Sequence, residues 1–383
     1  MIRSVYFDYA ATTPLEPEIA QQMMRFQTEC FGNPSSVHSF GRAAREAVNK
    51  ARNQVAALLG AEPAEIFFTS GGTESDNWAL KGIAWQNCAR GRHIITTAVE
   101  HHAVLRTCAW LEEQGFRVTY LPVDESGFVD PESVEHAMTE ETILVSVMTA
   151  NNEVGTIEPI AEIAAIAHAH GALFHTDAVQ AAAHIPLDVK AIGVDALSLS
   201  GHKFYGPKGI GALYLRRGTP IARFMQGGAQ ERTMRAGTEN TAAIAGMGMA
   251  AELAMKNMQT EMVVLAELRK RLMDGIRTIG GSWLNGPESS RLPGNVNFGI
   301  EGISSEALLI RLDLTGFAVS SGSACSAGSI EPSHVLLAMG QDTKKAGSAI
   351  RVSLGRYSTR ADVDAFLLAL GKIVREIRRV QEA

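Results

Sequence analysis

Residues 195–215 read DALSLSGHKFYGPKGIGALYL and contain two short apolar runs, Ala196–Leu199 and Gly211–Leu215. A short apolar run bounded by glycine and polar turn residues is typical of a buried β-strand. About a dozen residues without helical periodicity join the two runs, and a link of that length allows one strand to run antiparallel to the other. The stretch therefore predicts two strands of one sheet that are connected by a glycine-rich turn.

Further apolar runs precede this stretch and alternate with segments of helical periodicity. The predicted strands are Glu65–Thr69, His93–Thr97, Arg117–Leu121, Thr142–Val147 and Ala172–Thr176. The predicted helices are Arg42–Leu59, Ser75–Asn87, Ala103–Gln114, Pro131–Met138 and Ile160–His170. Such alternation is typical of a sheet covered by helices on both faces. The sequence thus predicts an α/β large domain with a mostly parallel seven-stranded sheet flanked by helices.

The remainder of the chain predicts a smaller α+β C-terminal domain. A long helical stretch, Ala242–Ile276, leads into it. Its predicted elements are strands at Asn295–Phe298 and Ile350–Ser353 and helices at Ser304–Leu312 and Ala361–Arg379. We expect an N-terminal arm at 1–16 that packs with the small domain, a large domain at 17–255 and a small domain at 256–383.

The bulk composition is that of a globular enzyme. The 383 residues are 46% hydrophobic and 20% charged, with a formal net charge of -6. No basic block interleaved with aromatic residues occurs, so direct nucleic-acid binding is not indicated. No apolar run approaches the ~20 residues of a membrane span, and the N-terminus lacks the pattern of a signal peptide. We therefore expect a cytoplasmic protein that does not bind membranes.

The cysteines are widely spaced and form no CxxC pair; they are Cys30, Cys88, Cys108 and Cys325. This spacing does not support a zinc site or a thioredoxin-like motif, so no metal is expected. Cys325 lies in SSGSACSAGS (320–329), a run of small residues that is typical of a loop. A buried structural cysteine is the commoner case in general. A thiol in a loop of small residues is instead typical of a reactive cysteine.

Two residues at predicted strand ends point to a cofactor. Lys203 follows the run Ala196–Leu199, and Asp177 closes the preceding run within ALFHTDAVQ (172–180). Pyridoxal 5'-phosphate (PLP) needs a lysine for a Schiff base and a carboxylate that keeps its ring nitrogen protonated. Each residue also has an ordinary explanation, a solvated surface lysine and a helix-capping aspartate.

Other motifs at strand ends fit the phosphate of the same cofactor. The segment Thr69–Asp76 reads TSGGTESD and precedes a predicted helix. Gly72 allows close backbone approach, and the helix N-terminus and the Thr73 hydroxyl can bind a phosphate. Ser200 and His202, on either side of Gly201, can add hydrogen bonds to it. A glycine-rich turn with a helix cap is the structural alternative.

Two further residues fit the cofactor ring. His101, in EHH (100–102) after a predicted strand, can lie over an aromatic ring and handle protons near neutral pH. Gln180 lies one helical turn beyond Asp177 and can donate to a cofactor oxygen. The chain thus contains four features of a PLP site: a phosphate cradle, a stacking histidine, a carboxylate and a lysine. All four are much less probable to occur together by chance than any one of them alone.

The chain also resembles a known family nearly from end to end. It is similar to fold-type I PLP-dependent transferases of the class V aminotransferase group, and specifically to NifS/IscS-type cysteine desulfurases. The motifs that carry the resemblance are YFDYAATTPL (6–15), FGNPSSVHSFGR (31–42), FTSGGTESDN (68–77), EHHAV (100–104), NNEVGTIEP (151–159), HTDAVQ (175–180), SGHKFYGPKGIGALY (200–214), GGAQERTMRAGTEN (227–240), SSGSACSAGSIEPSHVL (320–336) and IRVSLGR (350–356).

The resemblance implies a role for each motif around the cofactor. Lys203 would form the Schiff base, Asp177 would pair with the ring nitrogen, Gln180 would contact the phenolate oxygen, and His101 would stack on the ring. The residues implied to hold the phosphate are Gly72, Thr73, Ser200 and His202.

The resemblance also implies how substrate and subunits bind. Thr238, in RAGTEN, would reach the phosphate in a neighbouring subunit, which implies a homodimer. Asn152 would lie beside the cofactor and help to bind the substrate. Arg351 would clamp the substrate carboxylate with the paired N–H groups that suit arginine to this task.

The implied reaction depends on Cys325. A cysteine desulfurase converts L-cysteine to L-alanine, and Cys325 would take the sulfur as a persulfide and pass it to an acceptor protein. The loop at about 320–332 resembles that of the long-loop subgroup, although Ser326 and Ala327 stand where many members have Thr and Ser.

Two other functions remain open at this point. One is a selenocysteine lyase or another PLP enzyme of the class V aminotransferase group. The other is a catalytically inert partner-binding protein on the same fold. The acceptor is open as well, since iron–sulfur cluster assembly, tRNA thiolation, cofactor synthesis and DNA phosphorothioation all use such sulfur donors.

Overall fold

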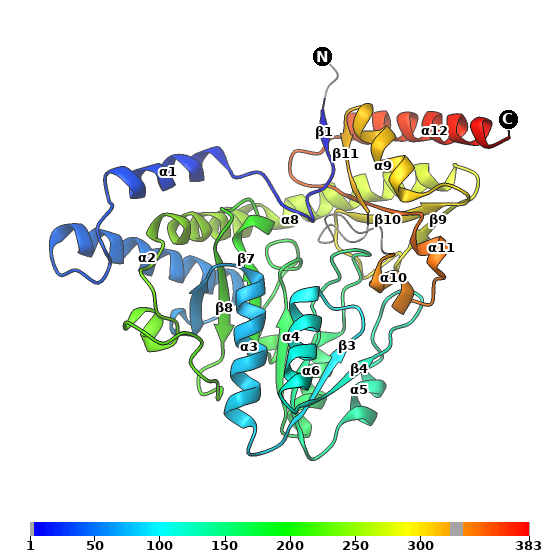
Figure 1. The fold of residues 1–383 in the computed structure, drawn as a ribbon. Helices are drawn as coiled ribbons and strands as arrows, with labels where there is room; N and C mark the ends of the chain where they lie inside the picture. The colour runs from blue at the N-terminus through cyan, green and yellow to red at the C-terminus, as the bar shows by residue number, and fades with distance from the viewer. Residues whose placement is uncertain (1–3, 322–331, 383) are drawn as a thin grey trace.

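A seven-stranded mixed sheet forms the lower part of the molecule in Figure 1. The computed structural model describes residues 4–321 and 332–382. The strands are β2 (Ile66–Thr69), β3 (His93–Thr97), β4 (Arg117–Leu121), β5 (Thr142–Ser146), β6 (Leu173–Asp177), β7 (Ala196–Ser200) and β8 (Gly211–Leu215). Their order is β2-β8-β7-β6-β5-β3-β4. Only β8 runs antiparallel to its neighbours, so the mostly parallel α/β sheet predicted from the sequence is confirmed.

Helices cover both faces of this sheet, because alternate residues of each strand point to opposite sides. In β3, Ile94 and Ile95 show this division. Ile94 packs in a cluster with Leu80 and Val104, whereas Ile95 packs in a cluster with Val55 and Ile163. The helices of this part are α1 (Pro17–Thr28), α2 (Ser39–Leu59), α3 (Gly72–Asn87), α4 (His102–Glu113), α5 (Pro131–Ala137), α6 (Ile160–Ala169) and α7 (Val189–Ile192).

Two differences from the predicted helices have clear causes. Helix α1 was not predicted, although Pro17 occupies a first-turn position that proline favours, and Ile19 is fully buried. Helix α3 begins at Gly72 rather than at Ser75. The first N–H groups of a helix have no partners within it, so glycine at this position costs little and leaves those groups available.

The second part of the molecule is built on the long helix α8 (Thr241–Arg277). Its antiparallel sheet has the order β12-β13-β10-β9, with β9 (Ser282–Asn285), β10 (Asn295–Ile300), β12 (Ser320–Ser321) and β13 (Ala349–Ser353). Its further helices are α9 (Ser305–Leu314), α10 (His334–Ala338), α11 (Thr343–Ala346) and α12 (Arg360–Glu382). A separate core contains Leu272, Phe298, Val352 and Phe366.

The start of the described chain packs on this second part. Strand β1 (Val5–Tyr6) pairs in parallel with β11 (Phe317–Ala318), so chain segments from opposite ends lie side by side (Figure 1). The ring of Phe7 contacts the rings of Phe317 and Phe366 at centroid distances of 6.5 and 5.8 Å. The domain boundaries at 16 and 255 stay a prediction.

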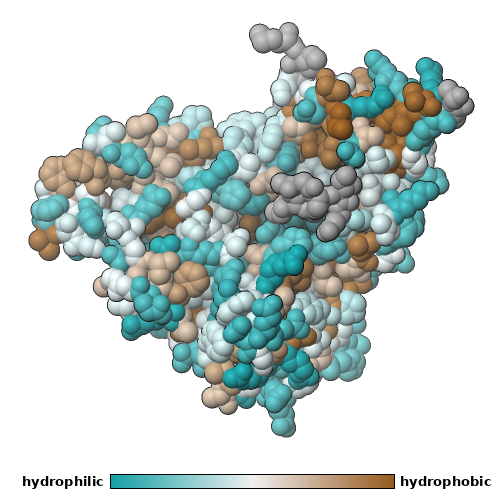
Figure 2. Space-filling model, viewed as in Figure 1, coloured by the Kyte–Doolittle hydropathy of each residue, from teal (hydrophilic) through white to brown (hydrophobic). Residues whose placement is uncertain are grey.

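Hydrophobic surface is concentrated over α9 and α12, as the brown areas at the upper right of Figure 2 show. Exposed apolar residues there include Leu314 on α9 and Leu368 on α12.

None of the helices in residues 4–321 and 332–382 combines the length and apolar character that a membrane crossing needs.

Gly211 provides a test of how tightly the carboxyl edge of the sheet is packed. It pairs with Thr69 on one side and with Ser200 on the other. A Cβ atom at this position would lie 2.6 Å from the carbonyl carbon of Gly71 and from the Leu199 oxygen. Both atoms belong to the backbone, so they cannot move aside as a side chain could. We expect G211A to lower the free energy of unfolding by about 1–3 kcal/mol, measured by denaturant titration.

The matched control for this substitution is G280A. At Gly280 the nearest atom to an added Cβ is Arg378 Nη1, at 3.9 Å. The control should unfold like the unmodified protein. Equal unfolding curves for G211A and G280A would show that this edge tolerates a methyl group.

Candidate active site

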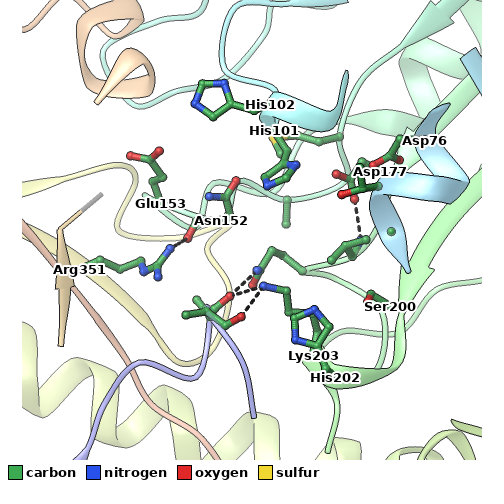
Figure 3. A pocket seen from close by; sticks show the side chains of 18 of the residues that line it. Asp76, His101, His102, Asn152, Glu153, Asp177, Ser200, His202, Lys203 and Arg351 are labelled. Carbon is green, nitrogen blue, oxygen red and sulfur yellow. Dashed lines mark hydrogen bonds between the residues drawn. The ribbon is translucent and has the colours of Figure 1, made fainter. Parts of the chain in front are cut away.

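A cavity of about 330 Å³ lies at the carboxyl edge of the seven-stranded sheet, where the second part of the molecule meets it (Figure 3). Most of the sequence-predicted site residues line it: Gly72, Thr73, His101, Asn152, Asp177, Gln180, Ser200, His202, Lys203 and Arg351. Thr238 does not; it is exposed on the loop before α8. Cys325 lies outside the described residues.

Asp177 is the last residue of β6 and lies on the wall of this cavity. It is 5% exposed, and its Oδ1 accepts a hydrogen bond from the Val179 N–H at 2.8 Å. Burial raises the pKa of Asp177 to about 6, although the Val179 N–H and the charge of Lys203 act to lower it. A buried carboxylate of this kind favours a cationic partner, which would restore its charge.

Lys203 ends the short 3-10 turn Gly201–Lys203 that follows β7. Its Nζ donates to the carbonyl oxygens of Ala10 and Ala11 at 2.7 and 2.9 Å. Gln180 Nε2 donates to the same Ala10 oxygen at 2.8 Å. The N-terminal arm therefore supplies one wall of the cavity, a contribution that we did not predict from the sequence.

The first turn of α3 forms another wall. Gly72 and Thr73 open the helix, and Ser200 lies at the end of the nearby strand β7. A Cβ atom on Gly72 would lie 2.5 Å from Val179 Cγ2, so only glycine fits without displacing that side chain. The free N–H groups and the positive end of the helix dipole make such a turn a binding place for an anion.

The two predicted cavity histidines are held neutral. His101 caps α4, where its Nδ1 accepts from the Ala103 N–H at 3.1 Å. Burial, with the charge of Lys203 next, lowers the pKa of His101 to about 4. The same two causes, in the same order, lower the pKa of His202 to about 4. Because Nδ1 of His101 accepts, the proton of its neutral ring is placed on Nε2.

Arg351 comes from β13 and reaches the cavity from the second part of the molecule. Its side chain is 2% exposed. Nη1 donates to the carbonyl oxygen of Asn152 at 3.0 Å, and Nη2 donates to Asp8 Oδ1 at 2.9 Å. A buried guanidinium held in this way suits recognition of a carboxylate.

Sequence reasoning missed several residues that line the cavity, among them Asp76, His102, Glu153 and His334. Asp76 lies beside Asp177 in Figure 3. Burial, together with the charge of Asp177, raises the pKa of Asp76 well above its usual value. The rings of His102 and His334 lie 4.6 Å apart between centroids. The sequence did contain a signal that could have identified them. All four residues lie in motifs that carry the family resemblance: Asp76, His102, Glu153 and His334.

These walls fit PLP in size and charge. The cavity volume lies at the lower end of the ~300–1,000 Å³ that small-molecule sites occupy. The turn at Gly72 offers an anion site that a side chain would fill, and Asp177 offers a buried carboxylate for a cationic ring nitrogen. Lys203 supplies the amine that an aldehyde requires.

Comparison with known proteins gives one consistent result. Residues 5–366 match the family described as Aminotransferase class-V. A curated relative, "Cysteine desulfurase IscS" of Clostridium botulinum, is 54% identical over 383 residues, covering 99% of this chain and 96% of the relative.

Solved structures agree with the sequence relatives. A structure titled "NIFS-LIKE PROTEIN" is 41% identical with a TM-score of 0.92, covering 97% of this chain and 99% of its own. Another, titled "SspA in complex with cysteine", is 38% identical with a TM-score of 0.82, covering 92% and 99%. The chain therefore belongs to the class V aminotransferase family, among its NifS/IscS-type cysteine desulfurases.

Proposed function

We propose that this chain converts L-cysteine to L-alanine, with transfer of the sulfur to Cys325 and then to an acceptor protein. The chain is a PLP-dependent cysteine desulfurase, as its relatives are named. The observation that carries the proposal is that Asp177 and Lys203 line one cavity together with the anion site at Gly72 and Thr73. The relatives' names favour this reaction over a selenocysteine lyase or an inert binding protein.

Different residues around the cavity would bind different parts of the cofactor. The α3 turn with Gly72 and Thr73, together with Ser200 and His202, would hold the phosphate, and Asp177 would pair with the ring nitrogen. Gln180 would donate to the phenolate oxygen, and His101 would lie against the ring. When bound, PLP links to an amine as a Schiff base and takes up the electrons of a neighbouring carbanion.

The proposed reaction needs one residue that orients the substrate and others that transfer protons. Arg351 would bind the substrate carboxylate and thereby fix the Cα–H bond relative to Lys203. The Lys203 Nζ would remove the Cα proton of the bound substrate and would later return a proton to Cα. His101 carries its ring proton on Nε2 and can serve as a proton donor within the cavity.

Cys325 supplies the nucleophile in the proposed sulfur transfer. Its thiolate attacks the substrate Sγ, an S–S bond forms, and the substrate Cβ–Sγ bond breaks. The electron pair of the broken bond stays with the three-carbon fragment, which takes up a proton at Cβ, regains one at Cα from Lys203 and leaves as L-alanine. Cys325 keeps the sulfur as a persulfide, so no external oxidant is required.

The described ends of the segment that contains Cys325 support this assignment. Before the segment, Ser320 pairs with Arg351 across the sheet. After it, His334 lines the cavity. The described residues on both sides of the segment that contains Cys325 therefore lie at the site, while Cys325 itself falls outside the described residues.

Homodimer formation and sulfur delivery belong to the same proposal. Thr238 is exposed, as a residue must be if it is to reach the phosphate in a second copy of the chain. An acceptor protein would take the persulfide sulfur. Incubation with L-cysteine and labelled sulfur, followed by measurement of alanine and of the labelled protein, tests the proposed function directly.

The lysine assignment predicts a spectroscopic change. K203A should lose the visible absorption of the protein-linked cofactor and release PLP on dialysis, because Lys203 is the only lysine among the described residues that line the cavity. Absorption spectra before and after dialysis check this. K190A, which alters an exposed lysine, is the control and should retain the band. A retained band in K203A would mean that a different lysine links the cofactor.

The cysteine assignment predicts that cofactor binding and turnover separate. C325A should bind PLP with an unchanged spectrum but form alanine from cysteine at least about a hundredfold more slowly, because the sulfur acceptor is missing. Amino-acid analysis of the reaction mixture measures this. C88A alters a half-buried cysteine elsewhere and should retain activity. Substantial alanine formation by C325A would rule out the covalent persulfide step.

The Asp177 assignment predicts a pH dependence of cofactor affinity. Burial raises the pKa of Asp177 to about 6, so the carboxylate is charged above that pH and becomes neutral below it. PLP affinity of the cofactor-free protein should therefore fall as the pH drops through about 6. Fluorescence titrations at several pH values measure it. D177N should bind PLP weakly throughout and lack this part of the pH dependence; an identical pH profile would contradict the pairing.

A further inference from the structure

Asp8 on the N-terminal arm contacts the arginine that the proposed function assigns to substrate binding. Arg351 Nη2 donates to Asp8 Oδ1 at 2.9 Å, while Nη1 donates to the Asn152 oxygen at 3.0 Å. Asp8 is not among the site residues that the sequence predicts. The two contacts reach the guanidinium from different chain segments, so together they fix its plane as well as its position.

The backbone around Asp8 is itself held in place. Asp8 forms a parallel bridge with Ser353, two residues beyond Arg351 on β13. The Ser353 N–H donates to the Phe7 oxygen at 2.8 Å, and the Ala11 N–H donates to the Asp8 oxygen at 3.0 Å. Because the arm is attached to the strand that carries Arg351, the carboxylate and the guanidinium share one rigid frame.

The guanidinium keeps donors for a ligand after these contacts are made. An arginine side chain has five N–H groups, and the two contacts use two of them. Within the described residues, the buried Nε has no hydrogen-bond partner. A buried cation is costly unless a carboxylate pairs with it, and Asp8 meets that need before any substrate arrives.

We propose that Asp8 is a positioning residue, which holds the Arg351 guanidinium in the orientation that receives the α-carboxylate of the amino-acid substrate. This role rests on the proposed function, because it presumes that Arg351 binds that carboxylate. In the alternative role, Asp8 would occupy the position of the substrate carboxylate on Arg351, and the substrate would have to displace it. The rigid attachment of the arm disfavours such a displacement and therefore favours the positioning role.

The test is D8N, which keeps the shape of the side chain and an acceptor oxygen but removes the charge. We expect the KM for L-cysteine to rise about tenfold with kcat changed less than about twofold, because a charge-assisted contact to the arginine is weakened. D8E restores the charge on a longer side chain and should recover much of the affinity. It also keeps the proposal testable if D8N folds poorly.

A matched control separates positioning from general loosening of the arm. Glu16 joins the same arm to Arg356 and Tyr357 of the second part, and none of these residues lines the cavity. E16Q should lower the melting temperature at least as much as D8N does, with the KM for L-cysteine unchanged. A rise of KM in E16Q equal to that in D8N would overturn the specific role of Asp8.

A second readout depends on the carboxylate itself. Cysteamine has the amine and thiol of cysteine but no carboxylate, so its inhibition constant should be the same in the unmodified protein and in D8N. An unchanged or lowered KM of D8N for L-cysteine, with normal turnover by the unmodified protein, would overturn the positioning role alone. Absence of alanine formation by the unmodified protein would instead overturn the proposed function.

Discussion

The reversal of β8 is the constraint on which the site depends. Because β8 runs antiparallel to both β7 and β2, these two strands point in the same direction and end at the same edge of the sheet. The first turn of α3, which follows β2, thereby comes to the edge where Lys203 follows β7. Gly211 lies between the two strand ends, and the absence of its side chain allows the Gly71 backbone to approach. The carboxyl ends of β3 and β6 bring His101 and Asp177 to the same edge.

The charges at this edge are arranged for a ligand that is anionic at one end and cationic at the other. The α3 turn presents free N–H groups, and His202 nearby is held neutral by burial and by Lys203. At the other end, Asp177 and Asp76 are both buried, and each disfavours a second negative charge beside it. A cationic ring nitrogen, as proposed for the cofactor, would relieve that cost. Burial is the largest cause of the raised pKa of both carboxyl groups.

The cavity is closed by parts of the chain that are distant in sequence. The N-terminal arm contributes the Ala10 and Ala11 oxygens, while β13 contributes Arg351. The arm and β13 are joined through the Phe7 and Ser353 backbone, and Phe7 anchors the arm in the core of the second part. The proposed substrate arginine and the proposed cofactor lysine are thus connected through one short segment.

The sequence by itself determined the seven strands of the large sheet and most of the helices between them, because apolar periodicity and glycine turns are local properties. It also identified most of the cavity residues, since ligands gather at strand ends and since the long motifs of the family cover the chain. The tertiary structure alone decided that Asp76 lines the cavity. It alone placed the Asp8 carboxylate against Arg351, 343 positions away. Such contacts depend on the packing of distant segments and on how burial changes a charge, which no local pattern encodes.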